Sequence, residues 1–401
     1  MLQPEPSSVA NIQVPYLKAG HVQWRGVELP PELPVMWASS ADIKTLTPSP
    51  GDLLICEGGE VGRAALAPND LPPNTIVQNS LHLIRESDTA CPRYLKYALS
   101  HVADSGWIDL ICNKATIAHL TVDKLRALPV PYWDKLNQQC IANFLDDKTA
   151  KIDALIAEKE RLVERLDEYR LSVVSNVLSI GLSGKAKLVA TGDTWFEAVP
   201  AEWSFCPLNY RYEVQLGKML DEKRITGEHL RPYLRNTDVQ WGAINIDGLP
   251  EMDVHPDELL RYSVQPRDLL VCEGGDVGRA AIWAGTANEV AYQKALHRVR
   301  PRTETDIPKF LFYALYDSAK RGRFADRGKA TIAHLTAEAF RRYCFPFPPI
   351  SEQHAIVEHL DERMSRLALL EQHSTEHIAR LREYRSSLIS AAVTGQIDLG
   401  S

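Results

Sequence analysis

Two long stretches of the chain share a spacing of apolar residues that is typical of amphipathic helices. In each stretch the apolar positions return at steps that alternate between four and three residues, and no proline interrupts the run. This is the heptad spacing of a helix that packs along a second helix. We therefore predict one spacer helix in residues 135–185 and a second, followed by a tail, in residues 350–401. The apolar positions expected in the helix contact are Ile141, Leu145, Ile152, Leu155, Leu162, Leu166, Ile356, Leu360, Leu367, Leu370 and Leu381.

The two patterns also match each other in register, polar interruptions included. Matched register favours two helices that pack on each other as an antiparallel coiled coil, with one globular domain at each end. The alternative is two unrelated amphipathic helices, each packed on its own domain.

The residues that precede each predicted helix have a different pattern of apolar and polar positions. Short apolar runs such as DLLIC and DLLVC are broken by Gly and Pro, which is typical of strands and tight turns, and a few helical segments lie between them. Proline-rich peptides end each stretch at 128–133 and 345–350, where they disfavour a continuing helix. The pattern predicts an α+β protein with globular domains at 1–134 and 186–349.

The sequence contains a long internal repeat. The peptide GDLLICEGGEVGRAA at 51–65 returns as RDLLVCEGGDVGRAA at 267–281, with twelve of fifteen positions identical. KATIAHLT at 114–121 recurs unchanged at 329–336. A period of this length is far longer than that of a solenoid repeat, so it indicates two whole domains in tandem.

Segments between the shared peptides diverge, among them roughly 64–80 and 242–262. A shared frame with divergent insertions is typical of one scaffold that presents two different surfaces. We therefore expect any specificity to reside in the divergent segments.

Motifs of common enzymes are missing from the sequence. It contains no GxxxxGK[ST] phosphate loop, no HExxH, no GxSxG and no GxGxxG after a strand. Asp52 and Glu57, like Asp268 and Glu273, resemble a nuclease carboxylate pair, but no nearby Glu-x-Lys completes it. We predict a protein without a catalytic centre, a cofactor or a metal of its own.

The glycines of CEGGEVGR predict a tight turn after a buried strand. Arg63 and Arg279 then emerge from a stiff turn, which suits either a DNA phosphate contact or an ion pair within the domain. Both readings are open.

The repeated KATIAHLT peptide combines residue types that meet DNA. Lysine pairs with phosphate, and threonine and histidine offer hydrogen bonds to base edges or backbone. For the histidines the alternative is that they satisfy buried backbone groups. The candidate DNA contacts are Lys114, Thr116 and His119 in the first copy, and Lys329, Thr331 and His334 in the second.

Charge and composition narrow the class of protein. The 401 residues carry a net charge of −7, yet residues 294–342 hold twelve Lys or Arg against five Asp or Glu. Seven cysteines without metal or disulfide spacing suggest a reducing cytoplasm. We find no apolar run of membrane-span length and no secretory signal, so we expect a cytoplasmic protein.

Several of these peptides together resemble a known family. GDLLICEGGEVGR, both copies of KATIAHLT, PFPPISEQHAIVEHLDE and the terminal SLISAAVTGQIDL are similar to the specificity subunit of type I restriction-modification systems. The resemblance implies two target-recognition domains, each reading one half of a bipartite duplex DNA target. It also implies a helix pair that sets the spacing between the halves, and no catalytic centre.

The resemblance implies partners as well. These are two adenine-methylating subunits that use S-adenosylmethionine, and restriction subunits that translocate DNA with ATP and Mg. The helices, with QQCIANFL and EQHAIVEHL, are the expected docking surface.

The first copy departs from the family pattern. EWSFCPLNYR belongs to a lead-in before PYLR in the second copy, whereas the first copy has only fourteen residues before PYLK and no equivalent peptide. We expect either a misassigned start codon or a shortened member, and both bear on DNA binding by the first domain. The rival functions are a coiled-coil adaptor without DNA specificity, which a weak salt dependence of DNA binding would favour, and a stand-alone nuclease.

Overall fold

The computed structural model describes residues 6, 10–112, 119–220, 227–287, 289–324 and 334–399. The chain forms a mixed α+β fold that divides into two compact units. The first unit comprises residues 1–161 and 374–401, and the second comprises residues 162–373.

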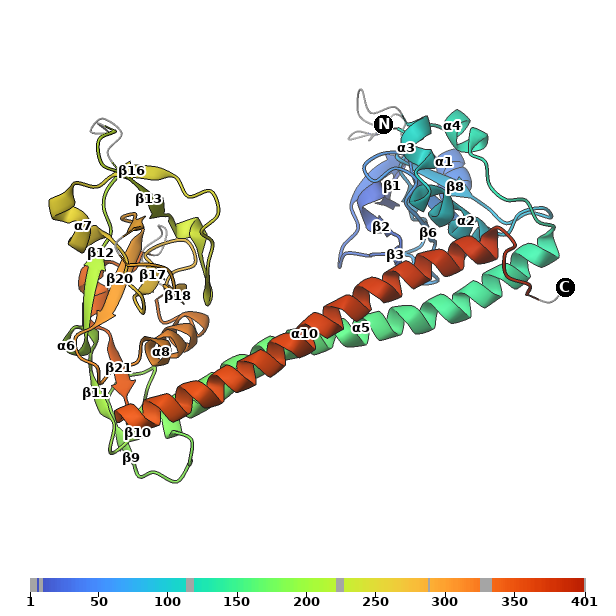
Figure 1. Cartoon of the computed structure of the whole chain (residues 1–401). Helices are drawn as coiled ribbons and strands as arrows, with labels where there is room; N and C mark the ends of the chain where they lie inside the picture. The colour runs from blue at the N-terminus through green and yellow to red at the C-terminus, as the bar shows by residue number, and fades with distance from the viewer. Residues whose placement is uncertain are drawn as a thin grey trace. The chain divides into compact units, whose positions relative to one another are not determined.

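The second unit is built on a four-stranded antiparallel sheet with the order β12-β20-β17-β18 (Figure 1). All four residues of β17, LLVC, are buried because the sheet is covered on both faces. Leu269 and Val271 pack into one core cluster and Leu270 and Cys272 into another. The sequence of β17 is therefore an unbroken apolar run and does not alternate between apolar and polar residues. The strands of this sheet are β12 (Tyr212–Leu216), β20 (Leu296–Pro301), β17 (Leu269–Cys272) and β18 (Ala280–Ile282).

Smaller sheets complete the second unit. A three-stranded sheet has the order β16-β13-β19, and β11 pairs antiparallel with β21. Helix α8 (Pro308–Lys320) begins with proline at its first turn, where the missing N–H costs nothing. The other elements are β9 (Leu188–Ala190), β10 (Ala198–Pro200), β11 (Ser204–Pro207), α6 (Leu208–Arg211), β13 (Leu230–Leu234), β14 (Val239–Gln240), β15 (Ala243–Ile244), β16 (Glu251–Asp253), α7 (Leu259–Tyr262), β19 (Ala291–Tyr292), α9 (Ala337–Arg342) and β21 (Cys344–Phe347).

In its described residues, the first unit repeats this plan with one strand fewer in the main sheet. Its order is β6-β5-β8, so β8 lies at an edge, whereas its counterpart β20 is flanked on both sides. A second sheet has the order β4-β1-β7, and β2 pairs with β3. The elements are β1 (Ile12–Leu17), β2 (Val22–Gln23), β3 (Gly26–Val27), β4 (Val35–Ala38), α1 (Ser40–Leu46), β5 (Leu53–Cys56), β6 (Ala64–Leu66), β7 (Ile76–Val77), β8 (Leu81–Ile84), α2 (Pro92–Asp104), α3 (Trp107–Ile111) and α4 (Val122–Ala127).

Two long helices, α5 (Lys135–Ile180) and α10 (Ile350–Val393), begin where the sequence pattern places them. Each contributes to both units. Within the first unit, the start of α5 packs with the end of α10 in one apolar cluster, and Arg385 pairs with Asp153 at 2.9 Å. Within the second unit, the end of α5 and the start of α10 share a cluster, and Arg170 pairs with Glu371 at 2.6 Å.

The buried positions along these helices differ from the predicted heptad in two places. Leu155 and Leu370, expected in the helix contact, are 47% and 44% exposed. Ile156 and Ile378 are buried in their regions. The buried step from Ile152 to Ile156 is four residues, where the predicted pattern has a step of three from Ile152 to Leu155. Of the other predicted positions, Leu162 and Leu381 are half-buried and the rest are buried.

One glutamine at the start of each long helix fastens it to the preceding globular part. Gln138 accepts from the Cys91 amide at 2.8 Å and donates to the carbonyls of Thr89 and Trp133. Gln353 makes the same set of bonds in the second unit, with the Ile307 amide and the carbonyls of Thr305 and Pro348. The QQC and EQH peptides, which we expected to dock partners, therefore contain residues that hold the protein's own fold.

Candidate nucleic-acid interface

The repeated glycine-rich peptide forms a tight turn between β5 and β6, and again between β17 and β18. Gly62 and Gly278 adopt φ values of +81° and +85°. A Cβ on Gly62 would lie 2.3 Å from Cδ1 of Ile108, and one on Gly278 would lie 2.5 Å from the ring of Phe324. Positive φ and missing space both require glycine at these two positions.

The arginine that ends each turn bonds inside its own unit. Arg63 donates to the Ala19 carbonyl at 3.0 Å and pairs with Glu60 at 3.0 Å. Arg279 donates to the carbonyl and the side-chain oxygen of Asn236, each at 3.0 Å. We had two hypotheses for these arginines, a bond within the domain and a contact with DNA phosphate. The observed bonds agree with the first, and a DNA contact stays a prediction.

His119 and His334 lie against this turn. Their rings are exposed and approach Gly58 and Gly274, where a Cβ would be 3.6 Å and 3.3 Å away. The residue after each histidine donates its amide to the turn, Leu120 to Glu57 at 2.7 Å. The fold therefore brings the end of KATIAHLT onto the glycine turn in both units.

The alternative in which His119 and His334 satisfy buried backbone groups is wrong. That role belongs to His82 and His297, whose Nε2 atoms lie 2.6 Å from the carbonyl oxygens of Leu120 and Leu335. These histidines sit on β8 and β20, and their spacing from the second peptide is the same in both copies. Lys114, Thr116, Lys329 and Thr331 lie outside the described residues.

A tryptophan flanks each turn. Trp24 donates its indole N–H to Glu60 at 2.7 Å, and Trp241 donates to Asp276 at 3.0 Å. We call the turn with its exposed histidine and its tryptophan the glycine-turn face. Burial raises the pKa of the Cys272 thiol, which lies at the base of one such face, to about 11, so this thiol is protonated and unreactive at neutral pH.

Much of the basic excess in residues 294–342 serves the fold. Arg300 pairs with Asp268 at 2.6 Å, and Arg323 pairs with Asp193 at 2.6 Å. Arg341 donates to the Val214 carbonyl at 2.6 Å. The local positive charge predicted from the sequence is therefore partly neutralised inside the second unit.

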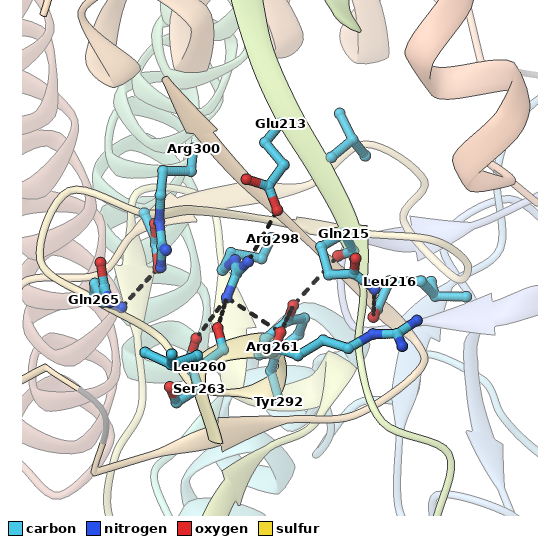
Figure 2. A network of polar contacts seen from close by, with 12 residues as sticks. Glu213, Gln215, Leu216, Leu260, Arg261, Ser263, Gln265, Tyr292, Arg298 and Arg300 are labelled. Atoms are coloured by element: carbon cyan, nitrogen blue, oxygen red, sulfur yellow. Dashed lines mark hydrogen bonds and ion pairs between the residues drawn. The ribbon is translucent and has the colours of Figure 1, made fainter. Parts of the chain in front are cut away.

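Arg298 is another deeply buried arginine of this group, and Figure 2 shows its surroundings. Its side chain is 3% exposed, and Nη1 donates to the carbonyls of Leu260, Arg261 and Ser263 at 3.0–3.2 Å. All three acceptors lie at the end of α7, where carbonyls lack partners within the helix. Tyr292 adds a bond to the Arg261 carbonyl at 3.1 Å. The network fixes α7 to the sheet.

The first unit holds a different short helix by a different arginine. Leu83 stands on β8 where β20 has Arg298, and α1 occupies the region before the repeated peptide. Arg85 donates to the carbonyls of Thr45 and Thr47, at the end of α1, at 2.8 and 3.2 Å. An arginine on β20 thus anchors a helix in the second unit, and an arginine directly after β8 anchors a different helix in the first. The sequence signal was the alternation of basic residues in LHRVRP, which we had counted only as net charge.

Within the described part of the chain, no cluster of three or more His, Cys, Asp or Glu residues could hold a metal ion. The described helices also include none that is long and apolar enough to cross a membrane.

Comparison with known proteins identifies a domain in this chain and several similar proteins. Residues 258–380 match the family model for the type I restriction modification DNA specificity domain. The chain is similar to the type I restriction enzyme EcoBI specificity subunit of Escherichia coli, with 23% identity over 71% of this chain and 62% of that protein. It is also similar to the EcoKI specificity subunit of Escherichia coli strain K12, with 21% identity over 67% and 57%. The chain therefore spans less than two thirds of the length of these relatives.

Solved structures share the fold at low identity. A chain from a type I R-M system, studied for its complex assembly and conformational transition, has a TM-score of 0.72 at 16% identity over 99% of this chain and 95% of that one. The HsdS subunit from Thermoanaerobacter tengcongensis has a TM-score of 0.58 at 16% identity over 99% and 94%. The class is thus that of proteins with a type I DNA specificity domain. Residues 258–380 match that domain, and the chain is similar to type I specificity subunits.

Proposed function

We propose that this chain is the DNA sequence-recognition subunit of a type I restriction-modification complex, and that each unit reads one half of a bipartite target. One observation carries the proposal. The two units share the glycine-turn face and its internal bonds, yet each anchors a different short helix, α1 or α7, through an arginine at a different position. A common frame with unlike exposed elements is what reading two unlike half-sites requires.

The shared face is suited to contacts that do not depend on sequence. The exposed His119 and His334 lie beside glycines in both units, and the lysines and threonines of KATIAHLT directly precede them. Lysine and backbone N–H groups contact phosphate and fix the register of a protein on DNA. We propose phosphate contacts from Lys114, Thr116, Lys329 and Thr331, with Arg63 and Arg279 stiffening the turns. We propose that the divergent elements make the contacts with the DNA bases.

We also propose that α5 and α10 pair antiparallel as the spacer between two target-recognition domains. In support, the start of α5 packs on the end of α10 in the first unit, and the end of α5 packs on the start of α10 in the second. The spacer would fix the number of unread base pairs between the half-sites.

Partner subunits complete the proposed complex, because this chain shows no catalytic motif. We propose docking of two methyltransferase subunits and of restriction subunits on the long helices. The exposed Leu155 lines an apolar groove of about 340 Å³ with Leu381 and Tyr384 in the first unit, and such a groove suits a protein contact.

The test is a genome-wide map of methylated adenines in the host with this gene intact and deleted. We expect one bipartite motif with a fixed gap to disappear on deletion. Unchanged methylation, together with DNA binding that barely depends on salt, would reject DNA recognition and favour the coiled-coil adaptor.

A further inference from the structure

Arg261, on the short helix α7, combines a fixed backbone with an exposed side chain. Its carbonyl oxygen accepts from Nη1 of Arg298 at 3.2 Å and from the Tyr292 hydroxyl at 3.1 Å. Both donors are buried on strands of the second unit, Arg298 on β20 and Tyr292 on β19. The backbone from which the Arg261 side chain emerges is therefore held in place by two strands.

The fold does not use the hydrogen-bond donors of this side chain. Figure 2 shows the guanidinium of Arg261 pointing away from the polar network, and no dashed contact reaches it. Within the described part of the chain it makes no hydrogen bond and no ion pair, and Cζ lies 5.1 Å from the centroid of the Tyr262 ring. A ring under a guanidinium restrains the guanidinium plane and leaves the N–H groups at its edge available.

A second cation near the same ring is neutralised within the unit. Nζ of Lys218 lies 5.8 Å from the Tyr262 centroid, and this lysine forms an ion pair with Glu258. The acidic residue closest along the chain to Arg261 is thereby already paired. Arg261 thus presents an uncompensated positive charge and a planar set of donors at the exposed surface of α7.

Arg261 also lies where the two units differ. It belongs to the divergent stretch 242–262, and the strand residue that holds it, Arg298, is replaced by Leu83 in the first unit. There Arg85 holds a different helix. A residue that reads one half of an asymmetric target requires such a difference, because an element common to both units would read the same base twice.

We propose that Arg261 reads a guanine in the half-site bound by the second unit, with its guanidinium donating to O6 and N7 of that base in the major groove. Guanine is the base that presents two acceptors side by side there, and the planar fork of arginine matches them. A side chain whose backbone is already fixed loses little freedom when it makes this contact. The inference rests on the proposed function and adds to it one residue and the base that it reads.

The experiment maps methylated adenines in hosts that carry Arg261→Ala or Arg261→Lys in the full chain. Lysine keeps the charge and loses the planar fork. Arg342→Ala is the matched control, because it removes an exposed arginine that pairs only with Glu338 on its own helix, α9. A second measurement is binding of the assembled complex to a duplex that carries the motif with 7-deazaguanine, which lacks the N7 acceptor, in place of each guanine of the second half in turn.

We expect one guanine position of the second half to become degenerate in both Arg261 variants, while the first half, the gap and the other positions stay as in the wild type. Arg342→Ala should keep the whole motif. At that one guanine, 7-deazaguanine should weaken binding of the wild-type complex by about fivefold or more and should scarcely change binding of the Arg261→Ala complex.

Several results would overturn the proposal. These are a second half-site without guanine, a motif unchanged in Arg261→Ala, and a wild-type complex that tolerates 7-deazaguanine at every guanine of that half. A motif that relaxes in Arg261→Ala and stays intact in Arg261→Lys would also overturn it, because lysine can replace arginine at a phosphate and not at a base read by the fork. All of these leave the proposed function standing, whereas a wild-type map that is unchanged on deletion of the gene rejects the proposed function itself.

Discussion

Nε2 of His297 lies 2.6 Å from the carbonyl oxygen of Leu335, and none of the His297 side chain is exposed. Because a carbonyl can only accept, Nε2 carries the proton. Nδ1 is buried and has no partner among the described residues. A second proton on the ring would lie on Nδ1 without an acceptor, and burial lowers the pKa of His297 to about 4.

This pKa predicts how the stability of the second unit depends on pH. In the unfolded chain the histidine binds its proton near the ordinary pKa of 6.5, and in the folded chain it does so only near 4. Between these values the unfolded state binds more protons, so the contribution is complete above pH 6.5 and is lost as pH falls toward 4. It amounts to on the order of 3 kcal/mol.

The variant His297→Gln keeps a donor for Leu335 and removes the titration. We expect the difference in unfolding free energy between wild type and variant to change across pH 6.5 to 4, measured by urea unfolding at several pH values. His354→Gln, at an exposed position on α10, is the control. A parallel pair of curves for wild type and His297→Gln would contradict the assignment.

The two glycines of one turn should differ in their tolerance of alanine. Gly278→Ala would place a Cβ 2.5 Å from the Phe324 ring at φ +85°, whereas Gly275→Ala at φ +72° meets only Asn236 Nδ2 at 3.6 Å. Both substitutions should lower the unfolding free energy by about 1–2 kcal/mol, because alanine disfavours the left-handed backbone conformation. Gly278→Ala should lose roughly 1–3 kcal/mol more through the clash. Denaturant unfolding measures both, and equal losses would mean that Phe324 moves aside freely.

Arg279→Lys separates the two readings of the turn arginine. The lysine side chain is shorter and should not reach Asn236 as Nη2 of Arg279 does, so we expect the second unit to lose about 1–3 kcal/mol of unfolding free energy. The slope of log affinity for duplex DNA against log salt should stay unchanged. A slope smaller by about 1 with unchanged stability would identify a phosphate contact instead. Arg267→Lys, at an exposed residue paired with Glu304, is the control.

The sequence predicted those features that depend on local pattern or repetition. Unbroken apolar runs placed β5 and β17, proline placed the starts of α5 and α10, and glycines placed the turns. The buried role of His297 could not be predicted, because its partner Leu335 is brought to it only by the tertiary fold. The exposure of Leu155 depends on how one helix rotates against another, which a single heptad pattern does not specify.

The local charge counted along the sequence was a poor guide to the charge of the folded surface. Residues 294–342 carry an excess of lysine and arginine, yet Arg300 and Arg323 pair with Asp268 and Asp193, which lie outside that window. A net charge taken over a window of sequence cannot include partners from distant strands. By contrast, part of the glycine-turn face could be predicted from the sequence, because its two peptides recur with matched spacing.

Arg298→Leu tests whether α7 reads DNA in the proposed function. Leucine is the residue that β8 carries at this position, so the change is compatible with the sheet. It removes the donor shared by Leu260, Arg261 and Ser263, and α7 should lose its fixed position. We expect the methylated motif to keep its first half and its gap while the second half becomes degenerate. Base contacts held in place typically contribute about 1–3 kcal/mol of discrimination each.

Two measurements make this outcome decisive. Arg302→Leu, which removes an exposed bond to the Asn209 carbonyl, is the matched control and should leave the motif intact. Hydrogen exchange of β17 reports whether the second unit is still folded. A motif unchanged in both halves, with α7 exchanging faster, would show that α7 contacts no base even though the protein recognises DNA. Loss of the whole motif with β17 still protected would instead place the effect of Arg298 on assembly with the partner subunits, because a reading defect confined to α7 leaves the first half-site intact.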